Sequence, residues 1–277
     1  MFNTFIEKLN TIINVSNDIL WTYVLIAPLI LLGLYFTFKT RFVQFRYIKE
    51  MFRLLTDGAT SKKEKGSVSS FQAFCISTAS RVGTGNLAGI AIAISVGGPG
   101  AIFWMWLIAL IGSASSFVES TLAQIYKQSD GNGAYIGGPA YYMEKALNMK
   151  WMGIIFSILI TICFGLVFNS VQSNTISLAL NEAFGVNRIL VGAILTLLTL
   201  SIIFGGIHRI AKVSEIIVPI MASAYILVAL FVVITNISEL PAMFALIFEN
   251  AFGLKQAVGG GIGGALLIGI KRGLFSN

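Results

Sequence analysis

The sequence predicts an all-α membrane protein, on three observations. Of its 277 residues, 56% are hydrophobic and only 11% are charged, whereas ordinary soluble domains are about 25% charged. The apolar residues gather in runs that approach the roughly 20 residues an α-helix needs to cross a bilayer. One run is interrupted by a polar, glycine-rich segment, which membranes tolerate only where the backbone is buried or lines a wet cavity.

The chain begins with an amphipathic segment and a first span. Between Phe2 and Ile13 apolar residues recur at helical spacing, which predicts a short helix at the membrane interface. Glu7 and Lys8 stand where the apolar core of a cleavable signal would lie, so no such signal is expected. Span 20–38 follows, with Trp21 as an interface anchor.

A tight turn separates the next two spans. Span 69–96 is apolar to about Ala79, then polar, then apolar again. The glycines and the proline of 97–100 form the turn, and span 101–126 carries Glu119. A carboxyl group within a span is costly, so Glu119 must face the protein interior with a partner or a proton.

Four further spans follow a loop at 127–150. The fourth span changes halfway from Ile/Leu-rich to FNSVQSNT, and Pro219 predicts a bend in the sixth. Cys75 and Cys163 lie in apolar runs and are expected to be buried free thiols. A single transmembrane domain, 1–277, is therefore predicted, with seven spans at 20–38, 69–96, 101–126, 151–184, 189–204, 213–235 and 258–270.

Positive charge is concentrated on one side of these spans. Fifteen of the nineteen Lys and Arg residues lie in 39–65, 127–150, 208–212 and 271–277. Because Lys and Arg favour cytoplasmic loops, these segments are expected inside, and the N-terminus outside, in a multi-pass protein of the plasma (inner) membrane. The net charge of +7 then reflects loops near anionic lipid, and no nucleic acid is expected as a partner.

The interrupted second span is the strongest candidate site, and two simpler readings explain it poorly. Residues 83–89, GTGNLAG, match the spacing of a dinucleotide fingerprint. That motif needs a preceding strand and an acidic residue about 20 residues on, whereas here membrane-length apolar runs flank it and the next acidic residue is Glu119. Close helix packing explains Gly89 but not the polar residues beside it.

We interpret the segment as a discontinuous helix. The N–H groups of residues 85–88 then face an anion such as a carboxylate, and unwound carbonyls face a cation. Thr78, Thr84 and Asn86 supply side-chain oxygens for the cation. Such sites pair two interrupted helices, and the glycines of 259–264 supply the second interruption.

Two further groups of residues belong to this hypothesis. Phe168 and Gln172 are four residues apart and share a helix face, so a ring and an amide can meet one ligand; interhelical hydrogen bonding is the alternative role for Gln172. Arg81 and Glu119 are a candidate intramembrane charge pair. Proton coupling and a cytoplasmic-end position are the alternatives for Glu119.

These residues resemble a known family. The segment from Phe71 to Trp106, FQAFCISTASRVGTGNLAGIAIAISVGGPGAIFWMW, is similar to the signature region of the alanine/glycine:cation symporters, also called sodium:alanine symporters. GGPAYYMEKAL at Gly137 and IKRGLFSN at Ile270 resemble further blocks of that family. The resemblance extends over essentially the whole chain from about Trp21.

The resemblance implies a leucine-transporter-like fold of two inverted five-helix repeats, preceded by one extra span. It implies a secondary active transporter for symport of small neutral amino acids, alanine or glycine, with Na⁺ as coupling ion, H⁺ in some members, and no other cofactor or metal. The substrate site is implied at Thr78, Gly83, Thr84, Gly85, Phe168, Gln172, Gly260 and Gly261.

Family members continue beyond the final SN with several further helices. The chain is therefore expected to be a C-terminally truncated fragment, with the first repeat and one helix of the second. Its partners are then the missing C-terminal helices, the amino acid, Na⁺ and the lipid bilayer, and the chain alone is expected not to transport.

Two other classes of function are alternatives. An intramembrane enzyme using Glu119 and His208 is not expected, because HExxH, paired aspartates and G-x-S-x-G are absent from the spans. A channel or a non-transporting membrane subunit is the second alternative. The absence of repeated polar faces along several spans counts against a pore.

Overall fold

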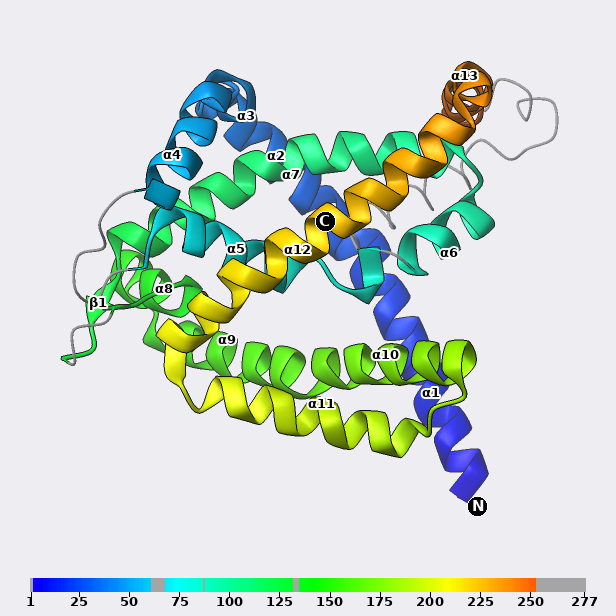
Figure 1. Cartoon of the computed structure of the whole chain (residues 1–277). Coiled ribbons are helices and arrows are strands. Elements are labelled where there is room, and N and C mark those ends of the chain that lie inside the picture. The colour runs from blue at the N-terminus through cyan, green and yellow to red at the C-terminus, as the bar shows by residue number, and fades with distance from the viewer. Residues whose placement is uncertain (1, 61–67, 87, 132–134, 253–277) are drawn as a thin grey trace. The chain divides into compact units, whose positions relative to one another are not determined.

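A computed structural model of the chain describes residues 2–60, 68–86, 88–131 and 135–252. The described part is helical apart from one two-stranded antiparallel ribbon, β1 (Gln128–Ser129) with β2 (Tyr135–Ile136), which confirms the all-helical prediction (Figure 1). Within it, three continuous helices are long and apolar enough to cross a membrane, Gly100–Ile125, Lys150–Phe184 and Gly206–Thr235. The chain divides into two compact units, which are taken in turn.

The first unit, residues 2–46, 88–117 and 237–252, opens with a single long helical run. α1 (Phe2–Ile19) passes through a π-helical segment, η1 (Leu20–Leu25), directly into α2 (Ile26–Lys39). Pro28 has no N–H to donate to the Val24 carbonyl, and the wider π turns lie directly ahead of it. The amphipathic segment and the first predicted span are therefore continuous in the structure.

The start of α7 (Gly100–Ile125) lies in close contact with the end of α13 (Leu240–Ala251) in this unit. The unit also contains α3 (Val43–Arg46), α6 (Ala88–Gly97) and η4 (Ile237–Glu239). A Cβ at Gly100 would lie 2.5 Å from the Ala251 nitrogen and 2.7 Å from the Asn250 carbonyl oxygen. Trp104 Nε1–H donates to the Ala251 carbonyl at 3.2 Å, and the Phe103 ring packs against Phe248 and Phe252.

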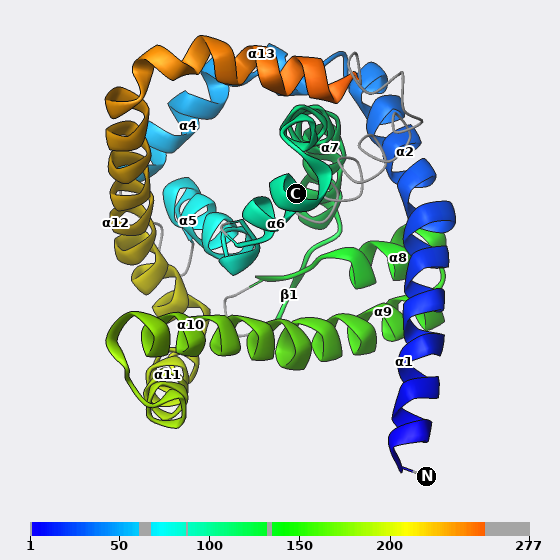
Figure 2. The same cartoon turned by 90° about the vertical axis from the view of Figure 1, so that its right-hand side faces the viewer.

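The second unit, residues 47–87 and 118–236, holds the interrupted helix and the helices packed on it. α5 (Ser70–Arg81) packs alongside α4 (Ile48–Thr60) and α12 (Gly206–Thr235) (Figure 2). α8 (Pro139–Leu147) packs on α9 (Lys150–Ile162), where the Ala140 carbonyl oxygen lies 2.7 Å from the position of a Cβ at Gly153.

One long helix and its antiparallel neighbour form the other part of this unit. α9, the π-helical η3 (Cys163–Phe168) and α10 (Asn169–Phe184) run as one 35-residue helix. Gly185, in the left-handed conformation, ends it, and the Asn187 side chain caps α11 (Arg188–Ile203) by accepting from the Ile189 N–H at 2.8 Å. α11 then lies beside α10 (Figure 1).

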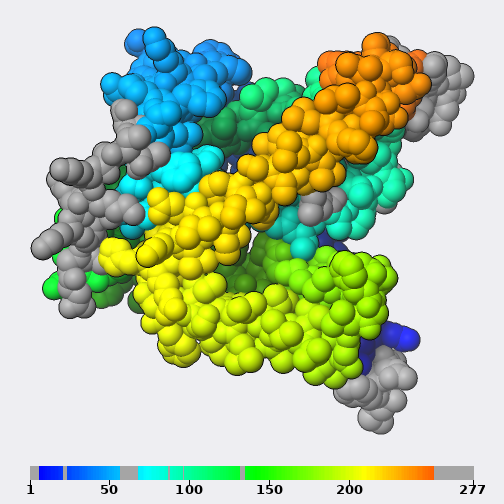
Figure 3. Space-filling model, viewed as in Figure 1, coloured from blue at the N-terminus to red at the C-terminus, as the bar shows by residue number. Residues whose placement is uncertain are grey.

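Two details of this unit differ from the sequence-based expectation. α12 begins at Gly206, seven residues before the predicted span, so that His208 lies in its first turns. Many of its large apolar side chains are exposed, which suits contact with lipid. The helix lies open at the surface in Figure 3, where it is yellow to light orange. Cys75 is buried as predicted, but Cys163 is exposed, because apolar helix faces in a membrane protein are covered by lipid as well as by protein.

Candidate functional site

The predicted interruption of the second span is present between α5 and α6. Ser69 and Gln72 form a capping box that starts α5. The helix ends at Arg81, because Val82 has extended backbone angles (φ −91°, ψ 106°). A 3₁₀ turn, η2 (Thr84–Asn86), follows, and α6 begins at Ala88.

Asn86 closes this turn from both sides. Its side-chain Oδ1 accepts the Gly83 N–H at 3.1 Å, and its own N–H donates to the Gly83 carbonyl at 3.1 Å. Short polar side chains compete in this way with regular helical hydrogen bonds. The Asn86 Oδ1 atom, which is predicted as a cation ligand, therefore already accepts one backbone hydrogen bond.

Gln172 of α10 reaches the same turn. Its Oε1 accepts the Thr84 N–H at 3.1 Å, across 88 residues of sequence. A Cβ at Gly83 would overlap the Gln172 amide group, so only glycine leaves room for this contact. The structure thus brings together four predicted site residues, Gly83, Thr84, Asn86 and Gln172.

The contact narrows the set of amides that could bind an anion. The N–H groups of Gly83, Thr84 and Asn86 have protein acceptors. Gly85, between them, is exposed, and the space at its Cβ position is open for at least 4 Å. The Gln172 Nε2 group donates to no acceptor in the part of the chain that the structure describes, and its N–H groups remain for a ligand.

Other predicted site residues are not joined to this cluster. Phe168 is 47% exposed, and its ring stacks on Phe164 with centroids 5.1 Å apart. Thr78 is half-buried in α5, where its carbonyl accepts the Val82 N–H at 2.8 Å. Gly260 and Gly261 lie outside the described residues.

The proposed charge pair also stays a prediction. Arg81 is the last residue of α5, and Glu119 lies in α7; both are exposed. Glu119 is close enough to Tyr142 of α8 to influence it: burial, and secondly the Glu119 carboxylate, raise the pKa of the Tyr142 hydroxyl. Tyr142 therefore stays neutral to higher pH than an ordinary tyrosine.

One polar contact in this unit is not indicated by any motif. Gln72, only 5% exposed, donates from Nε2 to Glu215 Oε2 at 2.7 Å and so ties α5 to α12. Glu215 is an acidic residue in an apolar span, the same signal that singles out Glu119. Within the described residues, no cluster of three or more His, Cys, Asp or Glu side chains is present.

These features define a multi-span helical membrane protein whose interrupted helix is tied to a second, 35-residue helix. The chain matches the sodium:alanine symporter family over residues 6–277, and it belongs to that family. It is thus a member of a family of transporters, not of enzymes.

Three relatives illustrate the match. The chain is 61% identical over 271 residues to the probable sodium/glutamine symporter GlnT of Bacillus subtilis, covering 98% of this chain and 56% of the relative. It is 59% identical over 268 residues to the amino-acid carrier protein AlsT of the same organism (97% and 57%). It is 36% identical over 272 residues to the sodium/alanine symporter AgcS of Methanococcus maripaludis (96% and 60%). The chain spans little more than half the length of these relatives.

Proposed function

We propose that the chain forms part of a secondary active transporter that carries small neutral amino acids, alanine or glycine, together with Na⁺ across the plasma membrane. Membership of the sodium:alanine symporter family supports sodium-coupled amino-acid symport as the class of transport. The observation that supports the site is the hydrogen bond from the Thr84 N–H to Gln172, which fixes the interrupted helix against α10.

The chemistry of the site suits a zwitterion and a small cation. We expect a carboxylate to bind at the exposed Gly85 backbone of the break, because unpaired N–H groups beside a helix end attract anions. The Gln172 Nε2 group adds a side-chain donor. Thr78, Thr84 and Asn86 supply neutral oxygens for Na⁺, and H⁺ is the alternative coupling ion.

The proposed fold is the leucine-transporter-like one, with two inverted repeats and an extra N-terminal span. The chain then contributes seven spans in one transmembrane domain, the first repeat and one helix of the second. The distribution of Lys and Arg favours an N-terminus outside the cell. In this arrangement Phe168, Gly260 and Gly261 complete the substrate site.

The size of the amino acid is the open choice within this proposal. The names of the relatives include both an alanine and a glutamine symporter. Alanine, glycine and glutamine are therefore the three solutes to compare.

A chimera tests the proposal. It consists of this chain joined to the part of GlnT that lies outside the 271-residue match, reconstituted in proteoliposomes with an inward sodium gradient. We expect saturable alanine uptake that collapses when K⁺ replaces Na⁺, inhibition by excess glycine, and no uptake by the 277-residue chain alone. Preferential inhibition by glutamine would instead assign the larger substrate.

Two results would overturn the proposal. Non-saturable flux that ignores the sodium gradient would support a channel. A chimera that is correctly folded, as shown by its helical content and monodispersity, but neither binds nor moves any of the three amino acids would support a non-transporting subunit.

A further inference from the structure

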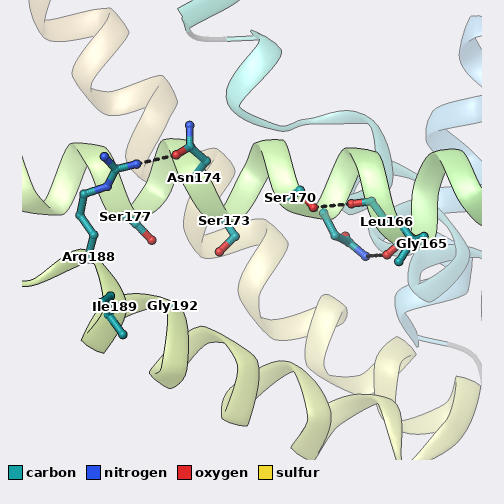
Figure 4. A pocket seen from close by; sticks show the side chains of 10 residues that line it. Gly165, Leu166, Ser170, Ser173, Asn174, Ser177, Arg188, Ile189 and Gly192 are labelled. Carbon is teal, nitrogen blue, oxygen red and sulfur yellow. Dashed lines mark hydrogen bonds between the residues drawn. The ribbon is translucent and has the colours of Figure 1, made fainter. Parts of the chain in front are cut away.

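A second polar site lies between α10 and α11. The two helices border a pocket of about 510 Å³. Taking 3.6 residues per turn, its three serines lie between about 100° and 160° around the helix from Gln172, so the pocket is on a different face from the one that contacts the interrupted helix. Its polar side chains are Asn169, Ser170, Ser173, Asn174, Ser177 and Arg188 (Figure 4).

Two serine hydroxyls in this pocket have no hydrogen-bond partner among the described residues. Ser170 and Asn169 donate to carbonyls of their own helix at 2.7 and 3.1 Å. Ser177 is only 5% exposed, yet neither it nor Ser173 forms a hydrogen bond with any residue that the structure describes. Both hydroxyls point from α10 toward α11 (Figure 4). Both hydroxyls line the pocket and are available to a ligand that accepts hydrogen bonds.

The cationic side chain of Arg188 lies at one end of the pocket. Arg188 is the first residue of α11, and its Nη2 donates to the neutral Asn174 Oδ1 at 2.5 Å. It forms no ion pair within the described ranges, and no Asp or Glu lines the pocket. The positive end of the α11 dipole adds to the local positive potential.

The position of Arg188 decides the kind of anion. It is the first residue after the turn that joins α10 and α11, and a turn between two membrane helices is expected near the level of the lipid phosphates. From Ser177 in α10 to Leu166 in η3 the pocket follows 11 residues of the long helix, about 16 Å. It becomes less polar toward Gly165, Leu166 and Gly192. A cationic end, hydroxyl donors along the pocket and less polar residues at the other end match an amphiphile better than a small solute.

We propose that this pocket binds one anionic phospholipid. The phosphate pairs with Arg188, and the glycerol ester oxygens accept hydrogen bonds from Ser177 and Ser173. One acyl chain lies along the glycines between α10 and α11. The site is independent of the proposed amino-acid site.

Native mass spectrometry of the purified 277-residue chain tests this. The chain is exchanged into detergent micelles that contain phosphatidylglycerol or phosphatidylcholine. We expect one retained phosphatidylglycerol per chain and weaker retention of phosphatidylcholine. Arg188→Gln should lower the apparent affinity for phosphatidylglycerol about tenfold or more, because a charge-assisted contact is lost. Arg209→Gln, the same change of charge outside the pocket, should not.

Three further variants separate charge from structure. Asn174→Ala removes the internal partner of Arg188 but leaves the cation, so it should retain the lipid. Arg188→Lys keeps the positive charge and should also retain the lipid; it serves as the comparison if Arg188→Gln folds poorly. Ser177→Ala should weaken retention. Equal binding by parent and Arg188→Gln would contradict the proposal. Displacement of the lipid by inorganic phosphate or alanine at the same residues would also contradict it. Loss of the lipid in the GlnT chimera would contradict it too, because it would show that protein covers the pocket there.

Discussion

At the scale of single residues, Gly83 and Gln172 act as one unit. The Gln172 amide occupies the space that any side chain at position 83 would need, and it accepts the Thr84 N–H. Gly83→Ala therefore displaces the Gln172 amide rather than the backbone, because the end of a glutamine side chain can move.

This coupling predicts a non-additive double-mutant cycle. In the GlnT chimera, Gln172→Ala and Gly83→Ala should each weaken alanine binding by the equivalent of one hydrogen bond, about 0.5–1.5 kcal/mol. The double variant should be no worse than Gln172→Ala alone. Alanine affinity measured by isothermal titration calorimetry provides the test, with Gly89→Ala, which meets nothing within 4 Å, as control. Fully additive costs would show that the two residues act separately.

A second residue-scale prediction concerns Tyr142. Its pKa is raised by burial and by Glu119, so Glu119→Gln should move that pKa down toward, but not to, its ordinary value. Ultraviolet difference titration against Tyr142→Phe measures this. A titration unchanged by Glu119→Gln would mean that the carboxylate has no effect.

The same shift has a consequence for stability. A raised pKa in the folded state contributes stability that is fully present below the pKa of an unfolded tyrosine, about 10. It is lost as the pH rises through the folded-state value. The thermal unfolding midpoint of the parent should therefore fall above about pH 10, and that of Tyr142→Phe should fall less.

At the scale of helices, glycines mark where backbones meet. Gly100 of α7 faces the backbone of Asn250 and Ala251, whereas Gly112, on the same helix, meets nothing within 4 Å. Gly100→Ala should destabilise the chain by about 1–3 kcal/mol, because backbone cannot move aside as a side chain can. Gly112→Ala should be neutral or slightly stabilising. Thermal unfolding in detergent distinguishes them, and equal midpoints would contradict the close contact.

The start of α5 offers a graded comparison. Ser69→Ala removes the cap of the helix, at a cost of about 1 kcal/mol. Gln72→Ala removes the capping box and also the bond to Glu215, which as a hydrogen bond to a charged group adds about 1.5–3 kcal/mol. Gln72→Ala should therefore lower the thermal unfolding midpoint more than Ser69→Ala does. A larger loss in Ser69→Ala would show that the hydrogen bond between Gln72 and Glu215 contributes little.

Which helices form was more predictable from sequence than which of their faces meet. Glycines and polar residues after about Ala79 indicated a break in the second span, and the structure has one between the end of α5 at Arg81 and the start of α6 at Ala88. Gln172, Ser173 and Asn174 read as one polar cluster in sequence, but the structure turns Gln172 to the break and the other two to the pocket at α11. The helical period shows which residues of a helix share a face. It does not show which neighbouring helix that face meets, because this depends on residues far away in the sequence.

Where a helix ends was also harder to predict near membrane boundaries. Polar residues at 207–212 read as a loop but continue α12, because a helix satisfies its own backbone whether its side chains face water or lipid. Pro28 does not end the first long helix; π-helical turns lie directly ahead of it instead.

At the scale of the whole molecule, the family assignment and the local geometry support one account. A chain of the sodium:alanine symporter family holds its interrupted helix in place through Gln172. In our proposal that arrangement forms one side of a joint site for an amino acid and Na⁺. Joint binding requires each ligand to raise the affinity for the other by the same factor.

The most direct test is therefore the equilibrium affinity of the chimera for alanine, measured in NaCl and in KCl of equal ionic strength. The account predicts tighter binding in NaCl, an equal gain in Na⁺ affinity when alanine is present, and loss of this coupling when Gln172→Ala disturbs the break. An alanine affinity that is the same in both salts would contradict it.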